Sequence, residues 1–213
     1  MPSLSSYDRG RKSFQGRSYR ADIDVGCDFH ERLWTPVKRR KKKQPRTVFC
    51  MGNHEHRVHR AIDLQPELEG AIGYSDFQLD RWYDDVVEYE GSTPGHIEID
   101  GITYAHYFIS GVAGRPVGGE HPATSLITKK LSSATCGHLH LADWSNRMAL
   151  HGNRIMGCFA GCYQDYISDW AGVISNLWWS GVVLKKEVSN GCYDPQFISL
   201  NQLKREYGRC SRS

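Results

Sequence analysis

The sequence predicts a layered α/β fold, in which helices pack against β-sheets. Short apolar runs over residues 47–51 and 134–136 have the length and composition of buried strands. Alternating residues on either side of Asp100-Gly101 indicate a β-hairpin, because this dipeptide favours a two-residue turn. Stretches with apolar residues at helical spacing lie between these strands, and this mixture is typical of a layered α/β sandwich.

The composition is that of a single globular domain, which we expect to span residues 1–213. Hydrophobic residues make up 39% of the chain and charged residues 24%, and the net charge of +3 gives no general argument for nucleic-acid binding. No apolar stretch approaches the roughly 20 residues that cross a bilayer, and the first residues lack the apolar centre of a secretory signal. We therefore expect a cytoplasmic protein without a membrane partner.

The first quarter of the chain begins with a polar segment. Residues 1–20 show neither helical nor strand periodicity and are predicted to form an extended arm. Apolar residues then recur at helical spacing over residues 22–34, and Pro36 is expected to end this helix. An unbroken basic run, residues 38–43, precedes the buried strand over residues 47–51.

The remaining elements follow from the same patterns. In order, they are a helix from His56, a helix over 76–87 with Ser75 and Gln78 as its capping box, strands over 97–100 and 102–108, a glycine-rich loop over 111–119, a helix over 121–131, a strand over 134–136, strand-like pieces over 154–159 and 179–184, and a helix over 200–207.

Polar residues that can bind a metal share one placement in this prediction, since each lies just after a strand or at its end. They are Asn53, His54, His106, His138 and His140. Loops at strand ends gather into one crevice in layered α/β folds, so we expect these side chains to form one site. Neutral imidazoles and an amide oxygen suit a divalent transition metal such as Mn, Fe, Zn or Ni.

The spacing of His138 and His140 favours two metal ions. On an extended segment, residues two apart point the same way, and in a turn after a strand they can address two adjacent ions. Two ions about 3.5–4 Å apart can clamp a phosphate and make water a nucleophile. The spacing of the two histidines therefore suits a two-metal site of this kind.

The ordered set Gly52-Asn53-His54-Glu55, His106 and Gly137-His138-Leu139-His140 resembles the later metal-binding motifs of calcineurin-like metallophosphoesterases. The resemblance covers residues 46–165 at the level of motifs. It implies the α-β-β-α sandwich of that family. It also implies a metal-dependent hydrolase of phosphate mono- or diesters, with nucleic-acid phosphodiesters among the candidate substrates.

The same resemblance implies roles for the individual residues. Asn53, His106 and His138 would bind one metal ion, and His140 would bind the other. His54 would protonate the leaving oxygen or stabilise the transition state as a charged donor.

The Asp-x-His and Gly-Asp-x-x-Asp motifs that precede this set in the family have no counterpart in the chain. Three neutral ligands without a carboxylate hold a divalent ion weakly, so we expect the dinuclear site to be incomplete, with one ion bound or none. The missing motifs end two parallel strands in the family. The resemblance thus implies a sandwich without its first two strands, with unpaired edges and a tendency to self-associate.

A narrower resemblance is to a phage- or prophage-encoded branch of the family. Residues 1–8, 105–108 and 114–121 carry it. In that branch the segment similar to residues 1–8 directly follows the second aspartate motif. The expectation is therefore that Met1 lies just past that motif.

Other candidate residues have two interpretations each. Arg115, in the loop over 111–119, either holds a substrate phosphate or belongs to a plain connection. The basic run over 38–43 either binds phosphate backbones or is a solvated loop. Binding through this run would make the protein non-catalytic: it would bind phosphate or nucleic acid, or act as an assembly protein, with the same fold.

Asp28 and His30 match the Asp-x-His pattern. They lie in a predicted helix, however, where residues two apart face different directions.

Overall fold

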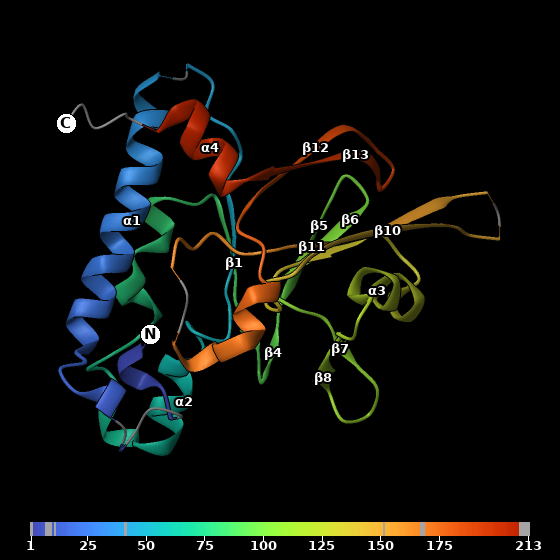
Figure 1. Ribbon diagram of the computed structural model, residues 1–213. Helices are drawn as coiled ribbons and strands as arrows, with labels where there is room; N and C mark the ends of the chain where they lie inside the picture. Colours follow the sequence, from blue (N-terminus) through green and yellow to red (C-terminus); the bar gives the residue numbers. More distant parts are fainter. Residues whose placement is uncertain are drawn as a thin grey trace. The chain divides into compact units, whose positions relative to one another are not determined.

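The computed structural model describes residues 2–6, 10, 12–40, 42–150, 152–166 and 169–208, except for the side chains of Ser13, Asp169 and Trp170. Lys41 of the basic run and several residues of the predicted arm lie outside this described part. The fold is mixed α/β, as the sequence predicts, with helices and several small sheets (Figure 1). The chain divides into two compact units, an N-terminal unit (Met1–Gly95) and a C-terminal unit (His96–Ser213).

The longest helix of the N-terminal unit is α1 (Tyr19–Arg40), and Pro36 lies inside it. The prediction that Pro36 ends this helix is therefore wrong. Tertiary contacts hold the turn beyond the proline, because Lys38 Nζ donates to the Arg81 carbonyl at 2.8 Å and Gln44 Nε2 donates to the Lys38 carbonyl at 3.3 Å. These contacts compensate for the backbone hydrogen bond that the helix loses at a proline.

Residues 1–20, predicted as an extended arm, contain two short 3-10 helices in their described part. These are η1 (Pro2–Leu4) and η2 (Lys12–Phe14). The backbone N–H and the hydroxyl of Ser3 donate to Asp22 Oδ2 at 2.8 and 2.6 Å. This carboxylate, in the first turn of α1, fastens the start of the chain to the helix.

The strand predicted at residues 47–51 is β1 (Val48–Cys50), and it pairs in parallel with β2 (Asp85–Val87). The helix predicted over 76–87 is wrong. Two short 3-10 helices, η4 (Tyr74–Phe77) and η5 (Leu79–Arg81), precede β2 instead. Gln78 separates them with a left-handed φ of 50°, and the β-branched pair Val86-Val87 then continues as a strand beside β1.

The predicted cap of that helix is also different. Asp76 Oδ2 accepts a hydrogen bond from Gly73 N–H at 2.9 Å, so this pair, and not Ser75 with Gln78, begins the turn. The other elements of the N-terminal unit are α2 (Arg57–Leu64), η3 (Pro66–Leu68), β3 (Tyr89–Glu90) and β4 (Thr93–Pro94).

A five-stranded sheet forms the centre of the C-terminal unit, in the order β10-β11-β9-β6-β5. Its strands are β5 (His96–Ile99), β6 (Ile102–Ala105), β9 (Ala134–Cys136), β10 (Ala142–Met148) and β11 (Arg154–Ala160). Strands β6, β9 and β11 are parallel, while β5 and β10 are antiparallel to their neighbours. The predicted hairpin at Asp100-Gly101 is confirmed, with φ values of 53° and 77°.

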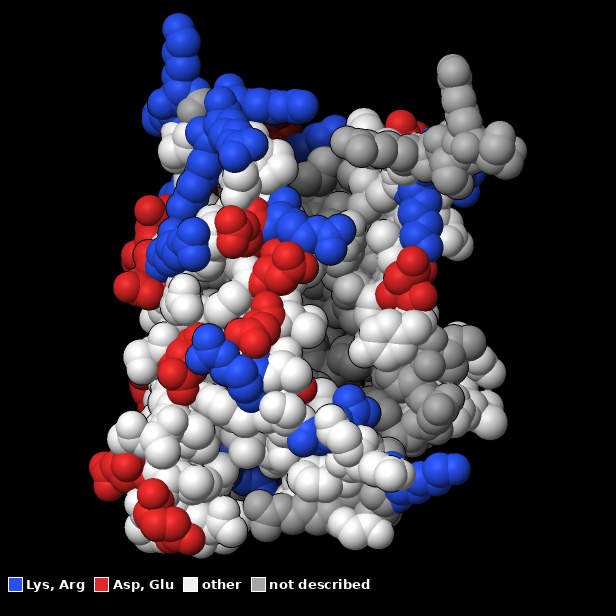
Figure 2. Space-filling model, turned by 90° about the vertical axis from the view of Figure 1, so that its left-hand side faces the viewer, with Lys and Arg blue, Asp and Glu red and all other residues white. Residues whose placement is uncertain are grey.

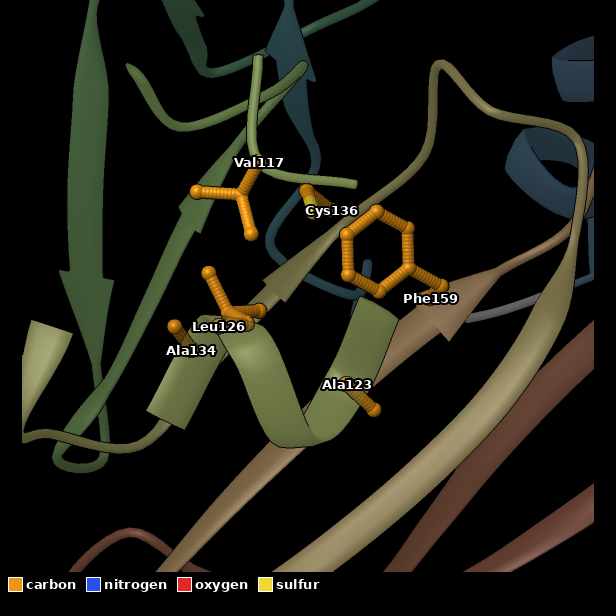
Figure 3. Close-up of a cluster of buried hydrophobic side chains, with 6 residues drawn as sticks. All are labelled: Val117, Ala123, Leu126, Ala134, Cys136 and Phe159. Atoms are coloured by element: carbon orange, nitrogen blue, oxygen red, sulfur yellow. The ribbon is translucent and has the colours of Figure 1, made fainter. Parts of the chain in front are cut away.

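Helix α3 (Pro122–Lys130) packs on this sheet, as Figure 3 shows for the side chains beneath it. Gly157 of β11 permits the close approach, because a Cβ there would lie 2.5 Å from the Ala123 carbonyl oxygen. The resulting core cluster consists of Val117, Ala123, Leu126, Ala134, Cys136 and Phe159.

The other elements of the C-terminal unit are β7 (Ile109–Ser110), β8 (Arg115–Pro116), η6 (Asp169–Leu177), β12 (Gly181–Ser189), β13 (Cys192–Ser199) and α4 (Leu200–Tyr207). Strands β12 and β13 form an antiparallel hairpin. Its residue Tyr193 joins Ile102, Met156 and Cys158 in a second core cluster.

Candidate functional site

The sheet of the C-terminal unit brings two of the predicted ligands into contact. His106 directly follows β6, and His138 lies two residues after β9. Because these strands are parallel neighbours, their carboxyl ends lie at the same edge of the sheet. His106 Nε2 lies 3.2 Å from His138 Nδ1, and Gly137 N–H donates to the His106 carbonyl at 3.2 Å.

Each of the two histidine loops is fastened to the core by one apolar neighbour. Phe108 and Leu139 pack against the cluster beneath α3, so the histidines beside them stay at its rim. His138 and His140 both have left-handed backbones, with φ of 67° and 62°. Such a conformation costs a residue with a side chain on the order of 1 kcal/mol. Strain at two predicted ligands on either side of an anchored leucine is consistent with a functional loop.

An aromatic ring contacts each of the histidines His138 and His140. The Tyr107 ring lies 4.7 Å from the His138 ring, and the Trp178 ring meets the His140 ring edge-on at 4.3 Å. Trp179 N–H donates to the His140 carbonyl at 2.9 Å, which joins the end of η6 to this loop. The sequence prediction missed both Tyr107 and Trp178. Tyr107 adjoins His106 in the sequence, whereas nothing in the sequence links Trp178 to His140.

The surroundings favour the neutral form of two imidazoles. Burial lowers the pKa of His138, and the nearby His140 lowers it further. Burial also lowers the pKa of His140. A neutral imidazole keeps a nitrogen lone pair, which is the form that binds a metal.

His106 Nε2 and His138 Nδ1 lie at hydrogen-bonding distance, and their separation can be compared with that of two ligands of one metal ion. Imidazole nitrogens lie about 2.1 Å from an ion such as zinc, so two ligands of one tetrahedral ion are about 3.4 Å apart. The 3.2 Å between His106 Nε2 and His138 Nδ1 is slightly shorter than that separation and is the distance of a direct hydrogen bond between the two rings. Within the described part of the chain, no group of three His, Cys, Asp or Glu side chains has an arrangement that could hold a metal ion.

The other two candidates lie in the N-terminal unit, in the turn after β1. Asn53 is half-buried and His54 is exposed. Glu55 Oε2 accepts a hydrogen bond from Gly52 N–H at 2.7 Å, and His56 N–H donates to the Gly52 carbonyl at 3.1 Å. The glutamate of this motif therefore shapes the loop, a role that its sequence position alone did not reveal.

Ring contacts stabilise the residue before α2, next to this turn. The His56 ring stacks on Tyr89 at 4.2 Å, and its Nδ1 lies 3.2 Å from the Tyr74 hydroxyl. Burial, assisted by Glu88 and Glu55, raises the pKa of Tyr74 to about 12, so the phenol stays neutral. Neutral rings thus support the turn that carries Asn53 and His54.

The remaining candidates have other surroundings. Arg115 is exposed on β8, within the hairpin that β7 and β8 form in the glycine-rich loop. Asp28 forms an ion pair with Arg32 of the same helix, whereas His30 Nδ1 lies 2.9 Å from the Tyr83 hydroxyl. The two residues of the Asp-x-His pattern therefore face different partners, as the helical position predicts.

Of the five predicted site residues, His106, His138 and His140 lie in the C-terminal unit, and the structure brings them to one edge of its sheet. Asn53 and His54 follow a strand of the N-terminal unit. Comparisons with protein-family models, curated proteins and solved structures found no match to this chain. Among the helices of the described residues, none is long and apolar enough to cross a membrane.

Proposed function

We propose that this protein is a metal-dependent phosphoesterase-like hydrolase of phosphate mono- or diesters, with an incomplete dinuclear site in this chain. The observation that carries the proposal is the 3.2 Å separation of His106 Nε2 and His138 Nδ1 at the ends of parallel strands. The motif order and the resemblance to calcineurin-like metallophosphoesterases support it. The α-β-β-α sandwich, the cytoplasmic setting and the phage origin belong to the same proposal.

In this proposal, His106 and His138 would hold one divalent ion, and His140 would contribute to a second. When bound, the ions supply Lewis-acid chemistry, which offsets the charge that develops on the phosphate and makes water a better nucleophile. His54 donates a proton to the leaving oxygen, and its exposure leaves it accessible to a substrate. Arg115 pairs with a substrate phosphate oxygen.

The test is manganese-dependent hydrolysis of a chromogenic phosphodiester by the full chain. His54→Ala is compared with the wild type, and His59→Ala is the control because it removes another exposed imidazole, on α2. Loss of a general acid should lower the turnover about 100-fold or more, while the control should stay within about twofold of the wild type.

Two results would overturn the catalytic assignment. One is equal turnover in His54→Ala and the wild type. The other is the absence of manganese-dependent hydrolysis above the rate with a chelator present.

A second candidate function is favoured by the charge at the end of α1. The last turn of this helix carries Lys38, Arg39 and Arg40, and Lys42 and Lys43 follow. Figure 2 shows Lys and Arg side chains gathered near the top of one face. Binding of a phosphate backbone to such groups is favoured by the counterions that it releases.

A cavity of about 250 Å³ adjoins these cations within the N-terminal unit. Lys38 Nζ and Arg81 Cζ lie 5.0 and 4.7 Å from the centroid of the buried Trp82 ring, which lines the cavity with Trp34. Two cations held over one ring present positive charge at a fixed place. This arrangement favours a phosphate- or nucleic-acid-binding protein without catalysis.

Anisotropy of a fluorescent single-stranded oligonucleotide tests the second candidate. Lys42→Ala/Lys43→Ala should weaken binding and reduce the slope of log K against log salt by about 1.4, since two phosphate contacts are lost. The control Lys129→Ala/Lys130→Ala removes the same charge from the end of α3 and should leave the slope unchanged. Equal slopes in both double variants would contradict binding at the basic run.

A further inference from the structure

Strand β10 forms one edge of the five-stranded sheet in the C-terminal unit. It has seven residues, contains no proline and pairs with β11 without a bulge, and within the described part of the chain no strand pairs with its other side. The opposite edge, β5, has only four residues and carries the exposed His96 and Glu98. Short strands, prolines, bulges and charges are the usual protection of a sheet edge, so β10 is the less protected of the two edges.

The side chains of β10 alternate between two faces, and three of them share the face beneath α3. Asp143 Oδ2 accepts a hydrogen bond from the Ala123 N–H at 2.8 Å, and the Thr124 hydroxyl donates to Ser145 Oγ at 3.0 Å. Arg147 is two residues further along the strand, so it belongs to the same face. Asp143, Ser145 and Arg147 therefore form a row with opposite charges at its two ends and a hydroxyl between them.

Both charged ends of this row can accept a further partner. Arg147 is exposed, and none of the ion pairs among the described residues includes it. Asp143 uses Oδ2 to hold the start of α3, which leaves Oδ1 able to accept a hydrogen bond from a guanidinium group.

An antiparallel pair of two β10 strands brings these ends together when a two-fold axis passes through Ser145, perpendicular to the sheet. Asp143 of each copy then lies opposite Arg147 of the other, and the two Ser145 hydroxyls face each other at the axis. On the other face, Ala142 lies opposite Met148 of the other copy, and Met148 is 56% exposed in the single chain. A shift of the opposing strand by two residues in either direction sets no opposite charges against each other.

Helix α3 leaves room for this pairing. It packs on both β10 and β11, and its start is fastened to β10 through Ala123 and Thr124. In the pair, the two α3 helices lie on the same face of the joined sheet, with their starts near the axis. Thr124 is small and exposed at this place, which permits the approach of about 8–10 Å at which helices pack.

We propose that β10 is a homodimer interface, where it pairs with β10 of a second copy of the chain and joins the two sheets into one. The occupant is a second copy because the row on β10 is complementary to itself, with an Asp143–Arg147 pair at each end. The interface is small, so we expect a dimer Kd of about 10–100 µM. This inference is independent of the proposed function, since neither metal nor substrate takes part.

Sedimentation equilibrium of the full chain tests the dimer. Arg147→Asp sets like charges opposite each other at both ends of the row and should raise the dimer Kd at least about tenfold. Asp143→Lys should do the same by placing two basic side chains together. Arg205→Asp is the matched control, because it reverses the charge of an exposed arginine on α4, outside β10, and it should leave the Kd unchanged.

A mixture of Arg147→Asp and Asp143→Lys separates the interface from a folding defect. In the mixed dimer the native acid–base pair is kept at one end of the row and its reversed equivalent forms at the other. The two variants, each shown to be folded by circular dichroism, should therefore associate with each other more tightly than either does with itself.

Three results would overturn the inference. A monomeric wild type at about 100 µM would leave the edge to a strand of another protein. Equal Kd values for the wild type, Arg147→Asp and Arg205→Asp would place the dimer contact elsewhere. Mixed variants that associate no better than the separate variants would exclude the opposition of Asp143 and Arg147.

Discussion

Lys185 is a charged side chain held among aromatic groups of the C-terminal unit. Its Nζ donates to the hydroxyls of Tyr104 and Thr135, and it lies 4.2 and 4.6 Å from the ring centroids of Tyr104 and Tyr193. Burial lowers the pKa of Lys185 to about 8, against the opposing effect of the nearby Cys158. The folded protein therefore binds the Lys185 proton less tightly than the unfolded chain does.

This difference makes stability depend on pH above neutrality. The pKa in the unfolded chain is 10.5, so between pH 8 and 10 the unfolded chain keeps the Lys185 proton more tightly, and the contribution of Lys185 to the free energy of unfolding rises with pH. Above about pH 10 this contribution levels off, and buried groups with raised pKa values act in the opposite direction. Burial raises the pKa of Tyr104 to about 12, so its ionisation favours the unfolded chain.

Lys185→Met should remove this rise. The wild type should gain stability relative to the variant by on the order of 1 kcal/mol from pH 8 to 10, because remaining solvent contact reduces the full effect. Urea unfolding at both pH values measures the difference. Lys186→Met is the matched control, since Lys186 is the next residue on β12 and is exposed. The same pH dependence in both variants would contradict the role of Lys185.

At the scale of the element, α3 ends in a strained residue. Leu131 has φ 56° and ψ 24°, its N–H bonds to the Ile127 carbonyl, and its side chain is 75% exposed. The left-handed conformation at a helix end favours glycine, and an exposed leucine gains little from burial. The backbone at the end of α3 is therefore strained.

Leu131→Gly should raise the free energy of unfolding by about 1 kcal/mol, because it relieves the strain without losing a buried contact. Leu131→Ala shortens the side chain but keeps a Cβ, so it should give no gain. Thermal or urea unfolding of the three proteins measures this. A gain of equal size in the alanine variant would show that side-chain exposure, and not the backbone, is responsible.

Elements with a strong local signal could be predicted from the sequence. The hairpin at Asp100-Gly101, the strand β9 and the helices α3 and α4 are confirmed within a few residues. The predicted helix end at Pro36 and the predicted helix over 76–87 are wrong for a different reason. Side-chain contacts made at a distance hold α1 beyond the proline, and pairing with β1 makes a strand of Asp85–Val87.

At the scale of the molecule, part of the candidate site was predictable because strand ends collect polar residues. The contact between His106 and His138 follows from parallel neighbouring strands. Trp178 could not be predicted in this place, since it reaches His140 from a segment 38 residues further along the chain. A cavity of about 430 Å³ that Trp178 helps to line is likewise formed by segments that lie far apart in the sequence.

Residues of the predicted set lie in both units of the chain. Asn53 and His54 follow β1 in the N-terminal unit, and His106, His138 and His140 follow strands of the C-terminal unit. The C-terminal part supplies imidazoles and no carboxylate to the predicted ligand set. We therefore expect weak metal binding that depends on the histidine pair.

Calorimetric titration of the full chain with Zn²⁺ tests this central claim most directly. His106→Ala and His138→Ala should each weaken binding at least about tenfold, since each removes one of a few ligands. His59→Ala removes an exposed imidazole outside the predicted set and should leave the affinity unchanged. Equal affinity in the wild type, His106→Ala and His138→Ala would contradict a metal site at the ends of β6 and β9.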